Sequence, residues 1–261
     1  MIAKLMKYDL KKMLRVLVYI YIVSISLAGI TRLINIGRDI QAIAILGYVF
    51  SGLTYSAIGS ILVNTFVHIL RTFIVGFYKD ESYLTHTLPV SKNKLLLSKY
   101  LSGLIVIITS VVVCFLSLFI LFYSPELMEL IKSFLNVSIS GLNMSVGLFI
   151  ALLILIIFAQ ICAIMSMCFT AVVKANTYNS KRVIKGLIWF AIFYFGATIV
   201  SIIAMVITFA IGGNLTELAA TKLSQSAFTT ILVLGLIVYM IYSVVFYFWC
   251  NKLFNKGVNV D

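Results

Sequence analysis

The sequence has few charged residues and very few acidic ones. Only 11% of the 261 residues are charged, and Asp and Glu together number 8 against 20 Lys and Arg. A soluble domain is roughly a quarter charged and half apolar, whereas this chain is 62% hydrophobic. A water-soluble fold of this length could not hide so much apolar surface. The composition therefore predicts an all-α membrane protein with a single transmembrane domain over residues 1–261.

Cysteine and the common catalytic motifs are scarce or missing. The four cysteines lie in or beside apolar segments without the paired spacing of a zinc site, so we interpret them as small apolar fillers: Cys114, Cys162, Cys168 and Cys250. The sequence has no phosphate-binding Gly-x-x-x-x-Gly-Lys loop, no HExxH and no GxSxG. We therefore expect no enzymatic activity, no metal and no cofactor in this chain.

Six apolar segments are long enough to cross a bilayer, which takes about 20 residues of helix. None has an acidic residue at its middle, which argues against an ion-coupled secondary transporter. The six predicted spans are residues 16–33, 40–70, 100–123, 144–173, 186–211 and 228–250.

Lys and Arg are distributed unequally between the two sets of connecting segments. Most lie in the N-terminal segment, in the loops after the second and fourth spans, and in the C-terminal tail. Because such loops stay in the cytoplasm, the distribution predicts that both termini are cytoplasmic. It also explains the net charge of +12 by topology and contact with anionic lipid, so we expect no nucleic-acid partner.

Two segments outside the spans have helical patterns. Residues 1–15 alternate lysines with apolar residues at helical spacing, which predicts an interfacial helix that lies in the headgroup plane before the first span. Residues 124–143 begin with Ser124, Pro125 and Glu126, a favourable start for a short external helix. That helix either links two spans or forms part of an outer gate.

One polar stripe occurs in the second span. Its members recur at steps of three or four residues and so share one helix face: Ser56, Ser60, Asn64, His68 and Arg71. The stripe is either a helix–helix interface with polar cross-links or the lining of a transport pathway or dimer seam.

The segment between the second and third spans, FYKDESYLTHTLPVSKNKLLLSK, predicts a helix–turn–helix over residues 71–99. Pro89 should break a helix that runs from Arg71 to His86, and Ser91 should cap the next one. The segment has a recognisable order: a phenylalanine, then mixed charges, then Thr-Leu-Pro-Val-Ser, and then a basic run that ends in a lysine. The residues in this order are Phe77, Lys79, Asp80, Glu81, Thr87, Leu88, Pro89, Val90, Ser91 and Lys99.

This segment, the basic N-terminus and the six spans together resemble the ABC-2 type permeases of ABC transporters. The chain departs from the family pattern in having Lys-Asp-Glu and Thr-His-Thr where Glu-Arg-Glu and Gly-Thr are usual. The resemblance implies a coupling helix that docks on a separate ATP-binding subunit. The residues that it assigns to this contact are Phe77, Lys79, Asp80, Glu81, Tyr83, Leu84, Leu88 and Pro89.

The resemblance also implies partners and a location. ATP and Mg²⁺ would bind to the separate ATPase subunits, and a second, identical or related permease subunit would complete the pathway. The expected activity is export of an amphiphilic peptide, lipid-like molecule or drug across a bacterial plasma membrane. The alternative is a membrane-embedded interaction protein, such as an immunity or sensor subunit, that needs no ATPase.

Overall fold

The protein consists of helices, as the composition predicts. The structure is a computed structural model, and it describes residues 2–37, 40–79, 81–87, 89–123, 129, 132–133, 146–178, 181–211 and 225–256. Within these ranges six helices are long and apolar enough to cross a membrane, which indicates a multi-pass membrane protein. The chain divides into two compact units, Met1–Leu130 and Ile131–Asp261, here called unit 1 and unit 2.

Each predicted span lies largely within one long helix. Unit 1 contains α1 (Ile2–Ile36), α2 (Gln41–Tyr78), the short α3 (Ser82–Thr87) and α4 (Lys92–Phe122). Unit 2 contains α6 (Val146–Ala175), α7 (Arg182–Ile211) and α9 (Gln225–Asn255). At 1.5 Å per residue α2 is about 57 Å long, well beyond the roughly 30 Å of hydrocarbon, so its ends reach past the apolar layer or the helix tilts.

The N-terminal segment differs from the prediction. Residues 1–15 were expected to form a separate interfacial helix, but α1 continues without a break from Ile2 to Ile36. The sequence offers no reason to stop at residue 15, since no proline occurs in this stretch and its first glycine is Gly29. The predicted external helix over 124–143 falls almost entirely outside the described residues.

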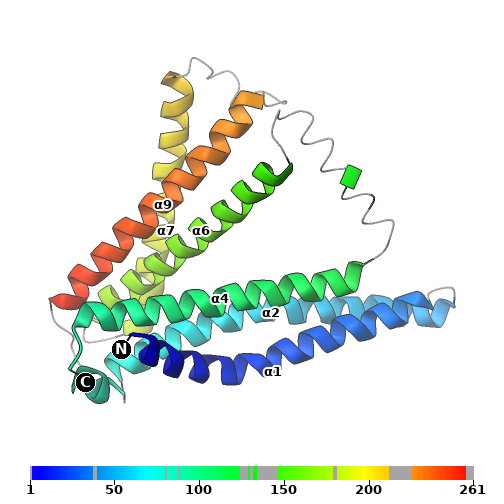
Figure 1. The fold of residues 1–261 in the computed structure, drawn as a ribbon, viewed down its shortest axis with the longest axis horizontal. Helices are drawn as coiled ribbons and strands as arrows, with labels where there is room; N and C mark the ends of the chain where they lie inside the picture. Colours follow the sequence, from blue (N-terminus) through cyan, green and yellow to red (C-terminus); the bar gives the residue numbers. More distant parts are fainter. Residues whose placement is uncertain are drawn as a thin grey trace. The chain divides into compact units, whose positions relative to one another are not determined.

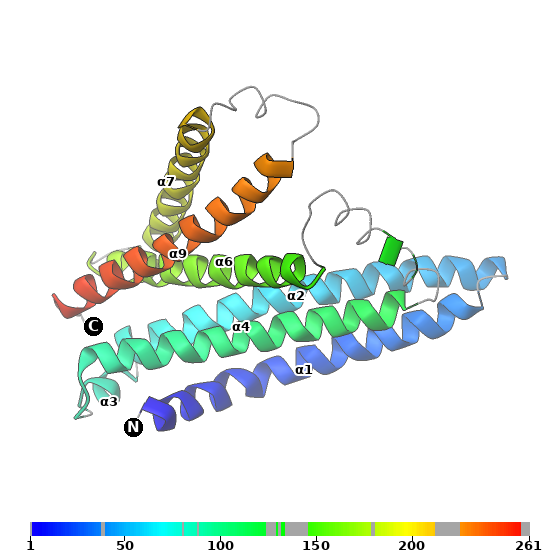
Figure 2. The same ribbon diagram turned by 45° about the horizontal axis from the view of Figure 1, so that its top comes forward.

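Hydroxyl groups connect the three long helices of unit 1, which run side by side with α1 against both α2 and α4 (Figures 1 and 2). The hydroxyl of Thr31 lies 2.7 Å from that of Thr54, which joins α1 to α2. Ser110 of α4 lies 2.6 Å from Tyr21 on α1 and 2.7 Å from Thr65 on α2. Buried hydroxyl pairs of this kind hold helices together where lipid removes the hydrophobic driving force.

Ser110→Ala is expected to lower the free energy of unfolding by about 1 kcal/mol, because it removes the hydroxyl shared by Tyr21 and Thr65. Equilibrium unfolding in mixed micelles measures this difference. Ser117→Ala is the matched control, because the hydroxyl of Ser117 accepts a longer hydrogen bond, 3.3 Å, from Ser24, and it should cost about half as much or less. Equal losses in the two variants would contradict the central role of Ser110.

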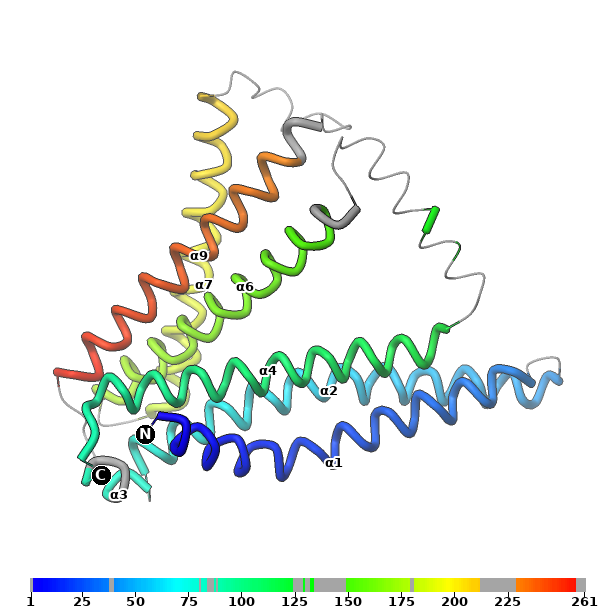
Figure 3. The backbone as a smooth tube through the Cα atoms, in the orientation of Figure 1, coloured from blue at the N-terminus to red at the C-terminus, as the bar shows by residue number. Residues whose placement is uncertain are grey.

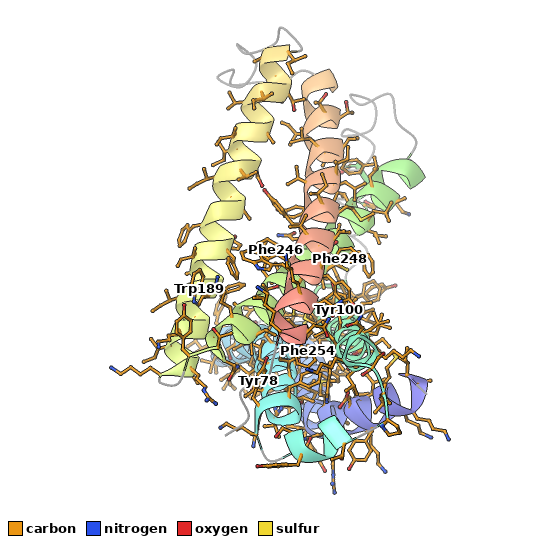
Figure 4. All side chains as sticks on the ribbon, turned by 90° about the vertical axis from the view of Figure 1, so that its left-hand side faces the viewer. Tyr78, Tyr100, Trp189, Phe246, Phe248 and Phe254 are labelled. Carbon is orange, nitrogen blue, oxygen red and sulfur yellow. The ribbon has the colours of Figure 1, made fainter. Side chains whose placement is uncertain are left out.

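Unit 2 has an aromatic core. Phe193 of α7 and Phe246 of α9 have ring centroids 5.3 Å apart, and both pack against Met167 and Ala171 of α6. Thr170 of α6 donates a 2.9 Å hydrogen bond to the carbonyl of Phe246. Trp189 and Phe193 near the start of α7 therefore meet Phe246 and Trp249 near the end of α9 within this unit (Figure 4).

Candidate functional site

The site lies at one end of unit 1, where α1 begins, α2 ends, α3 forms and α4 begins; we call this the α3 end (Figure 3). After Tyr78 the backbone N–H of Ser82 bonds the carbonyl of Lys79 at 2.7 Å, and this tight turn starts α3. The predicted continuous helix over 71–86 is therefore two helices. Ser91 occupies the N-cap position of α4 as predicted, but its side chain makes no capping hydrogen bond.

A buried ion pair joins α1 to α4 at the α3 end. Lys99 Nζ donates to Asp9 Oδ1 at 2.6 Å, and the side chains are only 12% and 8% exposed. Burying a charge is costly unless it is paired, so each partner fixes the position of the other. The pair links residues 90 positions apart and makes the first turns of α1 a structural part of the site.

A glycine on α2 makes room for Lys99. A Cβ atom at Gly76 would lie 2.9 Å from Lys99 Nζ and 3.2 Å from its Cε, so a larger residue would displace the ammonium group. The ammonium also lies 5.9 Å from the centroid of the buried Phe77 ring, within reach of a cation–π interaction. Phe77 in turn meets Phe73 edge to face, with centroids 5.0 Å apart. The end of α2 thus supports the ion pair between α1 and α4.

A second ion pair joins α1 to the turn that leads into α3. Lys12 Nζ bonds Glu81 Oε1, and the two side chains are 38% and 39% exposed. Lys12 lies one turn beyond Asp9 on α1, so both salt bridges use neighbouring positions of the same helix. The α3 end is therefore held at a buried point and at a water-accessible point.

The residues predicted for partner contact divide between the interior and the surface. Phe77 is fully buried, so it supports the fold of this end instead of offering a contact surface. Lys79, Tyr83 and Pro89 are exposed, and Tyr83 is 71% exposed. Glu81 is partly exposed and paired with Lys12. Leu84 belongs to α3, but its side chain, like the whole of Asp80 and Leu88, lies outside the described set.

The polar stripe of α2 does not face α1 and α4. The buried face of α2 consists of other residues, among them Thr54, Ile58, Ile61, Thr65 and Ile69. The stripe is exposed at Ser56 and Arg71 and half-buried at Ser60, Asn64 and His68. The side chains of Ser56, Ser60 and Asn64 donate to carbonyls of α2 itself at 2.7 to 2.8 Å. The hydroxyl contacts of α2 with α1 and α4 instead come from another face of the helix, at Thr54 and Thr65.

The pairing of Asp9 with Lys99 was not predicted from the sequence. A signal was present, because Asp9 is the only acidic residue among the first 38 and it shares a helix face with Met13 and Leu17. An acidic group on the buried face of a basic helix requires a cation from elsewhere in the chain. The sequence alone could not choose Lys99 among the many lysines.

The described residues of the α3 end connect helices and do not bring together the ligands of a metal site. Among the residues with described positions, no group of three or more His, Cys, Asp or Glu could hold a metal ion. The α3 end instead presents a short helix with an exposed tyrosine. The Lys12–Glu81 pair ties the turn before this helix to α1, and the Asp9–Lys99 pair ties α1 to α4. The two ion pairs therefore connect the turn before α3 with α1, and α1 with α4, and close-packed protein interiors transmit strain.

Comparisons of the chain with protein-family models, with curated proteins and with solved structures found no match.

Proposed function

We propose that the chain is the membrane-spanning permease subunit of an ATP-driven transporter, and that α3 is the element on which a separate ATPase subunit docks. One observation carries the proposal: the turn that leads into a short helix with an exposed tyrosine is tied to α1 by the Lys12–Glu81 pair, while the buried Asp9–Lys99 pair joins α1 to α4. An ordinary connecting loop would not need such attachments. The segment resemblance of residues 77–99 to ABC-2 permeases points the same way.

The proposed mechanism is transmission of movement. ATP-driven closure of the partner would displace α3, and Glu81 would pull on Lys12 and thus on α1. A displacement of α1 would then reach α4 through the pair of Asp9 on α1 with Lys99 on α4. Breaking this buried pair would cost more than moving the two helices together. The three helices of unit 1 would then move as one body relative to the transport pathway.

The remaining features of the proposal combine the charge distribution, which gives the orientation, with what the resemblance to ABC-2 permeases implies about partners and cargo. Both termini and the α3 end would lie in the cytoplasm of a bacterial cell, where the basic segments are retained. ATP and Mg²⁺ would bind to the partner, and two permease subunits would form the pathway. The stripe from Ser56 to Arg71, whose two ends are exposed, would line that pathway or the seam between subunits. Export of an amphiphilic molecule suits spans with so few charges.

A cross-linking experiment tests the proposal. The native cysteines of the chain would be replaced by alanine and a single cysteine placed at position 83. This variant would be purified together with a candidate ABC ATPase from the same genome. We expect a specific cross-link to the ATPase, and transport that depends on ATP hydrolysis. A cysteine at position 55, on an exposed part of α2 far along the helix, is the control and should give no such product.

Other results would redirect the assignment. Co-purification without a cross-link from position 83 would contradict docking at α3. If no ATPase associates with the chain at all, the ABC permease assignment is wrong and the interaction-protein alternative, an immunity or sensor subunit, takes its place.

A further inference from the structure

The ends of α6, α7 and α9 meet in unit 2 around one lysine. Lys174 Nζ lies 4.2 Å from the centroid of the Trp189 ring on α7 and 5.5 Å from that of Trp249 on α9. We call this region the Lys174 end of unit 2. Figure 4 shows Trp189 and, on α9, Phe254 toward the same end. Tryptophan rings prefer the level of the lipid headgroups, so the pair marks where this end meets the membrane surface.

The Lys174 end carries many cations and no described acidic residue. Besides Lys174, the start of α7 and the end of α9 supply Lys181, Arg182, Lys185, Lys252 and Lys256. The sequence after residue 130 has only two acidic residues, Glu217 and Asp261, and neither is among the described ones. Lys174 and Lys185 interact with aromatic rings, which leave their positive charge in place.

The first turn of α7 is positively charged, whereas negative charge stabilises the start of a helix. Acidic residues are favourable there because the backbone N–H groups point outward and the dipole is positive. This turn has no acidic residue and contains Arg182 and Lys185, with Lys181 immediately before them. Like charges add to the positive end of the dipole, so an external anion at this position would remove an unfavourable interaction.

The same turns of α7 expose large apolar side chains next to the cations. Val183, Ile184, Leu187 and Ile188 are all exposed. A free inorganic anion would leave this apolar surface uncovered, whereas a phospholipid would cover it with acyl chains while its phosphate meets the cations. The combination of clustered cations, adjacent apolar surface and interfacial tryptophans fits an amphiphilic anion.

We propose that the Lys174 end of unit 2 binds the headgroup of an anionic phospholipid, with Lys181, Arg182 and Lys185 around the phosphate and the Trp189 and Trp249 rings beside it. The inference stands apart from the proposed transport activity and from docking at α3. It predicts a lipid preference for the isolated chain, with no ATPase or nucleotide present.

The two tryptophans make the site directly measurable, because Trp189 and Trp249 are the only ones in the chain. The purified chain would be reconstituted in phosphatidylcholine vesicles that contain an equal mole fraction of brominated phosphatidylglycerol or brominated phosphatidylcholine. Bromine quenches tryptophan on contact. A basic residue near an anionic surface raises affinity about fivefold, so we expect clearly stronger quenching by the brominated phosphatidylglycerol.

Variants locate the effect. The triple change Lys181→Gln, Arg182→Gln, Lys185→Gln should abolish the preference, so that the two brominated lipids quench equally. The change Lys79→Gln, Lys92→Gln, Lys94→Gln removes the same charge from unit 1 and should keep it. Helicity by circular dichroism identifies any variant that fails to fold, and the wild-type comparison of lipids tests the proposal without any variant.

Several outcomes would overturn the proposal. Equal quenching of the wild type by both lipids would show that no anionic headgroup is preferred at the tryptophans. A preference that survives the triple change would place the headgroup elsewhere. Complete loss of the preference on adding soluble glycerol phosphate would identify a site for a free phosphate ester in place of a lipid.

Discussion

Tyr83→Asp is expected to weaken binding of the ATPase subunit by about 30-fold or more. Tyr83 is 71% exposed on α3, so its ring offers a large surface to a partner. Exposed tyrosines that become buried at an interface commonly contribute about 2 kcal/mol or more, and an aspartate would also place a charge in the contact. The affinity of the purified chain for the purified ATPase measures the effect.

The control must be an equally exposed tyrosine outside α3. Tyr8 is 74% exposed on the first turns of α1, and Tyr8→Asp introduces the same charge with the same loss of ring surface. We expect affinity close to that of the wild type for this variant. If both variants lose affinity equally, the partner contacts the whole α3 end and α3 is not the docking element.

The positions of the long helices could be predicted from the sequence because a membrane-spanning helix is formed by one continuous run of apolar residues. A run of about 20 apolar residues has no other stable solution in lipid, so each predicted span lies largely within one helix. The helix ends were harder to predict. The predicted helix over 71–86 ends earlier, because residues 71–78 complete α2, in which Thr72, Phe73 and Phe77 are buried, and α3 begins only at Ser82.

The candidate site was only partly predictable, because its ion pairs join residues that lie far apart in the sequence. The segment from Phe77 to Lys99 could be selected by its charges and its proline. The Asp9–Lys99 contact, however, depends on how α1 and α4 pack and on the space that Gly76 leaves. The polar stripe of α2 shows a second limit of prediction from sequence. Its periodicity correctly indicated one face, but periodicity cannot say which of two polar faces meets the neighbouring helices.

Asp9→Asn is expected to lower the free energy of unfolding by about 3 kcal/mol or more, because it leaves the Lys99 ammonium buried without a counter-charge. Chemical or thermal unfolding of the chain in micelles measures the change. Lys12→Gln is the matched control on the same helix. It breaks the exposed Lys12–Glu81 pair, and exposed pairs contribute about 0–1 kcal/mol, so its effect should be several times smaller.

A paired apolar replacement separates stability from transmission. Asp9→Leu combined with Lys99→Met removes both charges and fills similar space, so it should recover most of the stability that Asp9→Asn loses. If the pair also transmits movement from α3 to α4, the stable double variant should still bind the ATPase but hydrolyse ATP without matching transport. Normal coupling in this variant would restrict the pair to a structural role. A double variant as unstable as Asp9→Asn would show that the loss of stability in Asp9→Asn does not come from an unpaired Lys99 ammonium.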